Sequence, residues 1–347
     1  MQERKVKNPL RKYLSAGIFT PCTLFAFENQ DKMEDKILER IARKTGIANL
    51  VEVLSEQISG ADLNSLLLEI FHRKTGKIRP EALLDAYRNN RFVQPSTVNA
   101  LDFQAFILQT LQATQMAGFE PIILSPVSPL GACSVVATAH QHKIISALRG
   151  TEVTADATNL MALESTVRRI HRHLPAETLH LSTTHRHVRA QEIPDIPGFT
   201  AHFEVLALTS AGRDTGSFRF ETGSLLQHLQ FYMAYFNDVV KLPVKTIRLK
   251  ALDRADEPNR VFDAIVSFLQ TMHPEWPLDI QRTAATEQNY YEHLQFKVVM
   301  TAPSGVDIEI ADGGFTNWTR QLCRSKKERF LISGLGLELL QRVRGER

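Results

Sequence analysis

The sequence predicts an α+β protein in which helices flank an antiparallel sheet and a small helical unit precedes them. Two observations carry this prediction. The strand-like segments are unevenly spaced and are interrupted by helices without regular alternation, which disfavours a doubly wound parallel sheet. Residues 31–90, in contrast, show only the apolar spacing of helices. With 347 residues, of which 43% are apolar, the chain can hold one large domain and one small one.

Residues 1–95 are expected to form the helical unit, and residues 96–347 the main domain. Apolar residues at helical spacing, separated by glycine stops, divide the unit into four short helices. Asp62 is the predicted cap of the third helix, and Pro80 suits the first turn of the fourth. Basic residues between 73 and 79 fit a nucleic-acid-binding module, although such a unit more often packs on a neighbouring element.

The main domain opens with a predicted amphipathic helix over residues 99–117. The apolar run at 119–126 contains prolines and therefore favours an edge strand. Residues 210–216 are expected to form a loop, since their glycines lack the spacing of a phosphate-binding loop. Further strands are expected at 178–183, 203–208, 218–221, 244–249, 294–301 and 306–310, and further helices at 225–236 and 259–272.

Charge and cysteine content limit the class of protein. A net charge of +3 is too small to indicate nucleic-acid binding by itself. Cys22, Cys133 and Cys323 are too far apart for a disulfide framework or a zinc site, and the histidines form no metal-binding motif. Because no apolar run reaches the ~20 residues of a membrane span and no signal peptide is evident, we expect a cytoplasmic protein without a membrane partner.

The C-terminal segment carries the clearest motif. Residues 312–315 place two glycines together in a predicted turn, and residues 332–340 alternate small and apolar residues before a helix. Gly334 and Gly336 would let a flat base lie against the backbone of such a strand. This pattern resembles the third signature of class II aminoacyl-tRNA synthetases, which implies an ATP site. In that family an Arg follows the Glu of the signature, whereas Leu339 follows Glu338 in this chain.

Residues 184–191 and 198–204 resemble the second signature of the same family, most closely in its histidyl branch. The resemblance implies that Arg186 holds a phosphate and a carboxylate with its planar guanidinium, and that adenine stacks on Phe203. Val188 replaces the Glu that reads the adenine amino group in the family. Without the resemblance, this segment would be the exposed polar end of a strand. The resemblance adds three residues to the same site: Arg189, Gln191 and His202.

Two further matches imply an amino-acid pocket. Tyr290 and Tyr291 stand before a predicted strand, as does the Tyr pair that lines the pocket of histidyl-tRNA synthetases. Asp156 and Thr158 match the acidic residue and the Thr that meet the substrate α-amino group in that branch, where a carboxylate pairs with an ammonium. Read without the family, the tyrosines are one core ring and one surface ring, and Asp156 or Thr158 caps the following helix.

The resemblance extends over residues 99–341, and its first signature implies a homodimer formed through residues 99–126. Arginines that act in the family map to Thr286, Phe315 and Leu339 in this chain. Each lost charge-assisted contact removes roughly 1.5–3 kcal/mol. Because adenylate formation depends on such contacts in its transition state, their loss argues against an active charging enzyme.

These observations predict a synthetase-like paralogue, similar to the regulatory subunit of ATP phosphoribosyltransferase. The chain ends soon after the third signature, so we expect no anticodon domain. The protein would bind an amino acid or an adenine-nucleotide-like ligand, with ATP and Mg²⁺ as candidate cofactors, and act by ligand sensing or by regulating a protein partner. Two alternatives stay open: an ATP-dependent amino-acid activating ligase using Arg186, Arg189 and the basic loop at 320–326, and an RNA-binding adaptor.

Overall fold

The computed structural model describes residues 31–137, 139–171, 177–190, 200–252, 259–283 and 290–345. Gln191 and Thr286, both singled out in the sequence, lie outside these residues. The central sheet has eight strands: β1 (Glu120–Pro121), β4 (Leu179–Val188), β5 (His202–Arg213), β6 (Val244–Leu252), β7 (Leu278–Thr283), β8 (Glu292–Thr301), β9 (Asp307–Thr316) and β10 (Glu328–Gly336).

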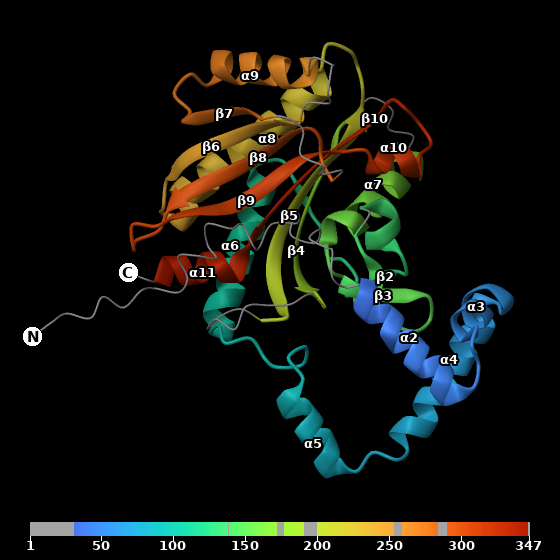
Figure 1. Ribbon diagram of the computed structural model, residues 1–347. Helices are drawn as coiled ribbons and strands as arrows, with labels where there is room; N and C mark the ends of the chain where they lie inside the picture. The colour runs from blue at the N-terminus through green and yellow to red at the C-terminus, as the bar shows by residue number, and fades with distance from the viewer. Residues whose placement is uncertain are drawn as a thin grey trace, which may run out of the picture.

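The strands are ordered β1-β4-β5-β10-β9-β8-β6-β7 (Figure 1). β1 is parallel to β4 and β7 is parallel to β6, whereas the other neighbouring pairs are antiparallel. The predicted α+β class with an antiparallel sheet is therefore confirmed. The proline-containing run at 119–126, which follows the helix predicted at 99–117, does supply an edge strand, although β1 is only two residues long.

Helices cover both faces of this sheet. The face that we call the back face packs against α6 (Ala100–Met116), α8 (Arg219–Ala234), α9 (Arg260–Met272) and α11 (Leu337–Gly345). Leu206, Phe296 and Leu335 belong to the apolar core between these helices and the sheet. The opposite, front face carries α7 (Ala157–His171) and α10 (Trp318–Leu322), where Trp318 packs with Ile332 of β10.

Shorter elements connect these layers. β2 (Val127–Pro129) pairs with β3 (Thr151–Val153) in a small antiparallel sheet beside α7 (Figure 1). The helical turns η3 (Ala132–Val136) and η4 (Gln141–Lys143) lie between β2 and β3, and η5 (Tyr235–Val240) extends α8.

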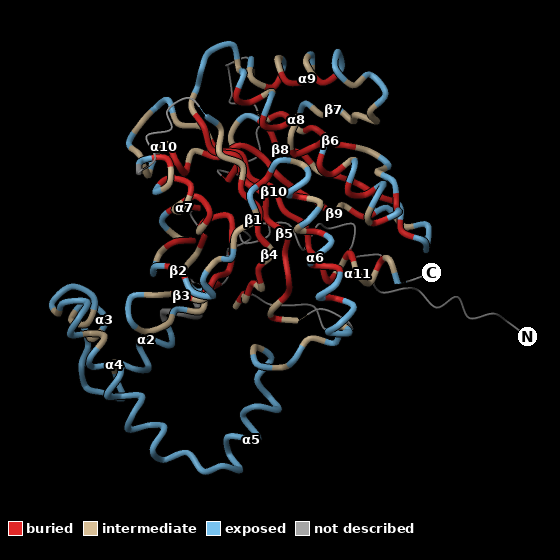
Figure 2. Tube along the Cα trace, turned by 180° about the vertical axis from the view of Figure 1, so that it is seen from behind, coloured by how far each residue is buried: buried red, intermediate tan, exposed pale blue. Residues whose placement is uncertain are grey.

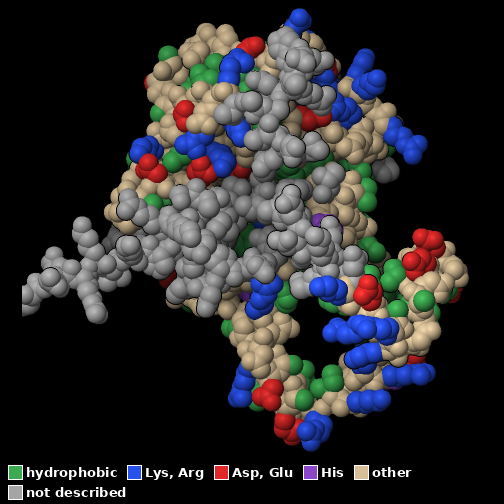
Figure 3. All heavy atoms as spheres, viewed as in Figure 1, with side chains coloured by type: hydrophobic (Ala, Val, Ile, Leu, Met, Phe, Trp, Pro, Cys, Tyr) green, Lys and Arg blue, Asp and Glu red, His purple; other side chains and the backbone are tan. Residues whose placement is uncertain are grey.

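The N-terminal helices project from the sheet as an arc (Figure 1). They are α2 (Asp31–Thr45), α3 (Leu50–Glu52), η2 (Val53–Gln57), α4 (Gly60–Thr75) and α5 (Pro80–Asn89). No residue from 36 to 100 is buried, and most of the arc is exposed in Figure 2, with a few half-buried residues. Phe71 and Leu83 are 50% and 60% exposed, and apolar and basic side chains lie side by side on this surface (Figure 3). These helices therefore bury none of the side chains from 36 to 100, although the backbone N–H of Arg149 donates to Asn64 of α4 at 2.7 Å.

Two boundaries of the helices differ from the prediction. Ser59 caps α4 in place of Asp62, because the Ser59 hydroxyl accepts the backbone N–H of Asp62 at 3.1 Å. Residues 219–221 begin α8 and do not form a strand. None of the described helices is both long enough and apolar enough to pass through a membrane.

The predicted loop at 210–216 begins too early. Residues 210–213 continue β5 and pair with β10, so the loop starts only after Arg213. Gly212 is needed there, because a Cβ would lie 2.7 Å from the ring of Phe220. The glycine thus reflects close packing of the first turn of α8 on the strand, and not a turn.

Gly313 and Gly314 lie inside β9, so the predicted Gly-Gly turn is also wrong. A Cβ at Gly313 would lie 2.5 Å from the ring of Phe296, and one at Gly314 would lie 2.6 Å from the ring of Tyr291. These two glycines therefore make room for aromatic rings of the protein itself.

Gly314→Ala should lower the free energy of unfolding by about 1–3 kcal/mol, because the added methyl group overlaps a well-packed ring and a backbone oxygen. Urea unfolding followed by circular dichroism measures this change. Gly223→Ala in α8 is the matched control, since a Cβ there meets no atom within 4 Å and alanine favours a helix. Equal stability of the two variants would contradict the packing of β9.

Candidate functional site

The pairing of β4 with β5 decides which side chains share a face of the sheet. His187 lies opposite Phe203, and Arg186 lies opposite Glu204. Because successive side chains of a strand point to opposite faces, His187, Arg189 and Phe203 face the front, whereas Arg186 and Glu204 face the back. Two separate polar groups result.

The front group, which we call the front-face cluster, consists of Asp156, Thr158, His187, Arg189, Phe203 and Tyr290. Asp156 precedes α7, and its Oδ1 accepts from the backbone N–H and the hydroxyl of Thr158 at 2.9 and 2.7 Å. The hydroxyl of Tyr290 donates to the other oxygen of Asp156 at 3.2 Å. The structure therefore brings these three predicted site residues together, and Asp156 also caps the helix as the simpler interpretation expected.

Arg189 is the buried cation of the cluster. Its side chain is 2% exposed, its Nε donates to the Ala155 carbonyl at 3.1 Å, and its guanidinium lies 5.2 Å from the centre of the Phe203 ring. Burial lowers the pKa of Arg189, and the nearby Asp156 carboxylate opposes this change. Within the described residues, Nη1 is buried and donates to no acceptor. This atom is therefore a buried donor that the described chain leaves unsatisfied.

His187 is a second donor without an acceptor. Its Nε2 accepts from the backbone N–H of Ala157 at 2.9 Å, so the proton of the neutral ring is on Nδ1. Burial, followed by the charges of Arg189 and His185, holds the pKa of His187 well below its usual value. In the described chain, Nδ1 is buried and has no hydrogen-bond partner. His187 is thus a neutral N–H donor on the same face as Arg189.

The floor of the cluster consists of glycines, which carry no side chains. Gly334 and Gly336 of β10 lie opposite Ala207 and Val205 of β5, on the face that carries Phe203. A Cβ at Gly334 would lie 3.0 Å from a backbone oxygen of β5. The two predicted floor glycines are therefore on the same face as the predicted stacking ring.

Several polar residues around the cluster were missed in the sequence. Asp312 is fully buried and accepts from the Tyr291 hydroxyl and, at 2.8 Å, from Gln295. Burial raises the pKa of Asp312 to about 6. Cys133 is also buried, and burial together with the charge of Asp156 raises the pKa of its thiol to about 12, so the thiol stays protonated. The available signal for Asp312 was an acidic residue directly before the paired glycines Gly313 and Gly314.

Arg186 belongs to the back group, and its predicted place beside Phe203 and Tyr290 is wrong. Its guanidinium pairs with Glu338 at 2.7 Å and with Glu204 at 3.5 Å, and it lies 2.9 Å from Nδ1 of His202. The physical reason is the alternation of the strand, which turns residue 186 away from residues 187 and 189.

The linker after the N-terminal helices closes over this back group. The Ser96 hydroxyl donates to Glu338 at 3.1 Å, and the Gln94 carbonyl oxygen lies 2.5 Å from Nε2 of His202. His202, which was predicted to contact ligand, therefore joins Gln94 of the N-terminal unit to the sheet. Glu338, also predicted to contact ligand, instead binds Ser96 at the start of the main domain. Phe315 and Leu339 stand at two of the positions where the family has an arginine. Both also face away from the front, because they pack with the core of the back face.

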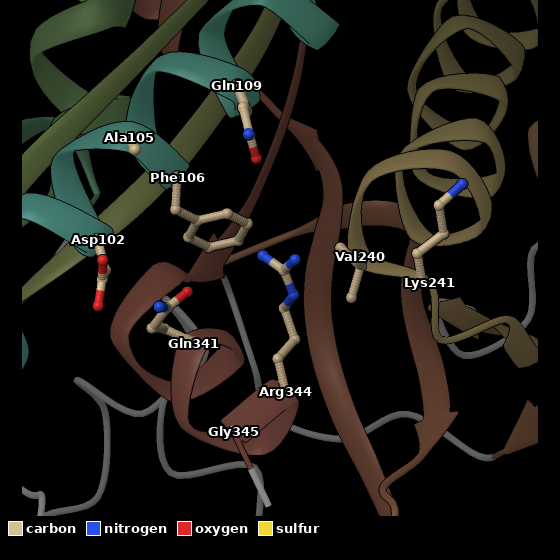
Figure 4. A pocket seen from close by; sticks show the side chains of 9 residues that line it. All are labelled: Asp102, Ala105, Phe106, Gln109, Val240, Lys241, Gln341, Arg344 and Gly345. Atoms are coloured by element: carbon tan, nitrogen blue, oxygen red, sulfur yellow. The ribbon is translucent and has the colours of Figure 1, made fainter. Parts of the chain in front are cut away.

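A separate hollow of about 410 Å³ lies between α6 and α11. Figure 4 shows the Arg344 guanidinium beside the ring of Phe106, and the two are 4.7 Å apart. Asp102, Gln109 and Lys241 at its rim are exposed, so water can solvate their charges and amides. This hollow therefore lacks the buried, unsatisfied donors of the front-face cluster.

Glu204 should make stability depend on pH. Burial raises its pKa from 4.5 to about 7, and the nearby Arg186 opposes the rise. Because the folded pKa exceeds the unfolded one, the folded state takes up a proton between these values, and stability falls as pH rises through that window. The stability of wild type relative to Glu204→Gln should therefore fall by about 1–3 kcal/mol between pH 5 and pH 8.

Chemical unfolding at several pH values measures this difference. Glu81→Gln, at an exposed position of α5, is the control and should follow the wild-type pH profile. A constant difference between wild type and Glu204→Gln across the window would show that the buried carboxyl is not the titrating group.

No protein-family model and no curated protein sequence matches this chain. Solved structures do match. The S. aureus histidyl-tRNA synthetase is 13% identical, with 73% of this chain and 68% of that chain covered at a TM-score of 0.54. A Bacillus halodurans protein described as an ATP phosphoribosyltransferase regulatory subunit/histidyl-tRNA synthetase is 12% identical, with 74% and 83% covered at 0.56.

A histidine–tRNA ligase subunit from Alicyclobacillus acidocaldarius is also 12% identical, and the match covers 73% of this chain and 95% of that chain at a TM-score of 0.53. At such low identity these matches establish the fold alone. The chain therefore has the fold of a class II aminoacyl-tRNA synthetase core, of the kind seen in the histidyl enzymes and their regulatory relatives.

Proposed function

We propose that this protein binds a free amino acid in the front-face cluster and reports its presence to a protein partner, without charging tRNA. The observation that carries this proposal is the buried guanidinium of Arg189, whose Nη1 has no acceptor in the described chain. A buried, charged donor that lacks an acceptor is unfavourable, typically by about 1–3 kcal/mol or more. An incoming carboxylate would remove this cost.

The cluster matches both ends of an amino acid. Arg189 and the N–H of His187 offer donors to a carboxylate, and Asp156 offers an acceptor to an ammonium. Counting Arg189 as +1, Asp156 as −1 and His187 as neutral, the formal charges of the cluster sum to zero, like those of a free amino acid. This balance favours a zwitterion over a singly charged ligand.

The same arrangement favours an amino acid over an adenine nucleotide. Arg186, the expected phosphate clamp, is on the back face and is already paired with Glu204 and Glu338. The guanidinium of Arg189 lies over the ring of Phe203, where adenine was expected to stack. A nucleotide would have to displace these contacts, so ATP with Mg²⁺ remains a weaker candidate ligand.

The regulatory role rests on the described relatives and on the exposed surfaces. One structural neighbour is described as a regulatory subunit and another as a ligase subunit. We propose that the N-terminal unit, residues 1–95, contacts the partner, because its described helices expose apolar side chains. An RNA-binding adaptor is the other interpretation of this unit. Binding of tRNA with an affinity that falls as the salt concentration rises would favour the adaptor.

Arg189→Gln should weaken amino-acid binding roughly 10- to 100-fold, because it removes one charge-assisted contact. Isothermal titration calorimetry of wild type against each amino acid, and against ATP with Mg²⁺, identifies the ligand first. Arg186→Gln is the matched control: it removes an arginine of the same strand that faces the other side, and it should bind as wild type does. Equal loss in both variants, or no amino-acid binding by wild type, would overturn the proposal.

Exchange of pyrophosphate into ATP, measured with the bound amino acid, separates this proposal from an active ligase. We expect no exchange above background, because the guanidinium of Arg186 is engaged elsewhere and Phe315 and Leu339 face the core. Robust exchange would instead establish the ATP-dependent amino-acid activating ligase.

A homodimer through residues 99–126 remains part of the proposal. Leu101, Met116 and Ile123 in this segment are 83%, 86% and 99% exposed, which suits apolar contact with a second copy. Met116→Asp should therefore shift the protein from dimer to monomer in sedimentation velocity experiments. Met272→Asp, at an exposed methionine on the distant helix α9, is the control and should leave the sedimentation coefficient unchanged. A monomeric wild type would reject the dimer.

A further inference from the structure

Helix α5 lacks the packing that a short helix needs. It spans only the ten residues Pro80–Asn89, and isolated helices of fewer than about 12–15 residues are marginal in water. Such helices are normally stabilised by burying an apolar stripe against the rest of the protein. Every residue from 68 to 91 is exposed, however, so α5 buries no side chain in the described chain. The packing that α5 lacks must therefore come from outside the described residues.

The apolar stripe of α5 consists of Leu83, Leu84 and Tyr87. Because Tyr87 lies four residues after Leu83 and three after Leu84, the three side chains share one side of the helix. Their exposed fractions are 60%, 50% and 47%. Ile78 before the helix and Val93 after it are exposed as well. Exposed apolar surface of this kind is typical of interaction sites.

The charge around this stripe is positive. Residues 69–93 contain six Lys or Arg and three Asp or Glu, which leaves a net formal charge of +3. This count already includes the acidic partners of the two ion pairs, Arg73–Glu69 and Arg88–Asp85. Three further cations form no ion pair with any described residue: Lys74, Lys77 and Arg79. Figure 3 shows Lys and Arg side chains gathered along the arc, with apolar ones between them. This surface therefore complements an acidic partner.

The segment after α5 joins this helix to the chain beside the proposed amino-acid site. Arg91 donates to the carbonyl of Ala190 at 3.2 Å, and Ala190 directly follows Arg189 of the front-face cluster. The side chain of Gln94 donates to the carbonyl of Tyr87 in the last turn of α5. A partner that docks on α5 would therefore act on the chain next to the ligand site.

We propose that α5 is the docking surface for an amphipathic helix of the protein partner, whose apolar stripe covers Leu83, Leu84 and Tyr87 and whose flanking residues are acidic. A helix is favoured because the side-chain ridges of two helices interlock along such a stripe. RNA is disfavoured, because its phosphates would pair with the cations and leave the two leucines exposed. This inference rests on the proposed role of the N-terminal unit and not on the amino-acid site.

The probe is a fluorescein-labelled helical peptide with leucines along one stripe and glutamates beside it. Its control peptide carries lysine at every glutamate position. Fluorescence anisotropy measures the binding of each peptide to the full chain. Wild type should bind the acidic peptide roughly tenfold or more tightly than the basic one, with an affinity that falls as the salt concentration rises.

Leu83→Glu should weaken binding of the acidic peptide roughly tenfold or more, because it replaces a central apolar contact with a charge of the same sign as the peptide. Met272→Glu, at an exposed methionine of α9, is the matched control and should bind as wild type does. Lys77→Glu should weaken binding several-fold and reduce its dependence on salt, whereas Lys327→Glu, at an exposed position before β10, should do neither. Circular dichroism establishes that each variant is folded.

The proposal is overturned if both peptides bind equally, if Leu83→Glu binds the acidic peptide unchanged, or if wild type binds neither peptide. Binding of single-stranded polyuridine in place of the acidic peptide would assign the surface to RNA. A wild-type dimer that Leu83→Glu converts to a monomer would assign it to a second copy of this chain. Either of these two results would equally overturn the proposal.

Calorimetry with the amino acid separates the docking surface from the amino-acid site. Leu83→Glu should bind the amino acid as wild type does, because its side chain is exposed on α5. A wild type that binds the amino acid but neither peptide would keep the amino-acid site and reject the docking surface. One that binds the acidic peptide but no amino acid would do the reverse.

Discussion

The register between β4 and β5 is the constraint on which the site depends. Pairing residue 187 with residue 203 places alternate side chains of both strands on opposite sides of the sheet. One side receives His187, Arg189 and Phe203 and lies under the first turn of α7. The other side receives Arg186, and residues 94–96 cover it. A shift of one residue in this pairing would exchange the two groups.

The two polar groups differ in how fully they are satisfied. Arg186 finds two carboxylates and a histidine within the chain. That histidine, His202, also contacts Gln94 and so links the N-terminal unit to the sheet. Arg189 is more deeply buried and leaves one donor unused in the described chain, as does His187. Unsatisfied buried donors are rare in folded proteins, which is why the front group is the better candidate for ligand binding.

Fold class, sheet type and most elements were predictable from the sequence, because apolar spacing and glycine stops reflect local packing. Asp156, Thr158 and Tyr290 were all predicted to line one ligand pocket, and the structure does bring them together. The face of Arg186 was not, since a motif read as consecutive residues does not state which side of the strand each one takes. The roles of Gly212, Gly313 and Gly314 were missed as well, because Phe220, Phe296 and Tyr291 come close to them only in the fold.

The tautomer of His187 tests this arrangement most directly, because it reports the contact between β4 and the start of α7. Long-range ¹H–¹⁵N correlation spectra, with His187→Gln used for assignment, distinguish the two ring nitrogens. The structure predicts a neutral ring that is protonated at Nδ1 and accepts at Nε2, and that stays neutral as the pH falls through 6.5. A ring protonated at Nε2, or one that becomes charged near pH 6.5, would contradict the assignment of His187 and Arg189 to the front face.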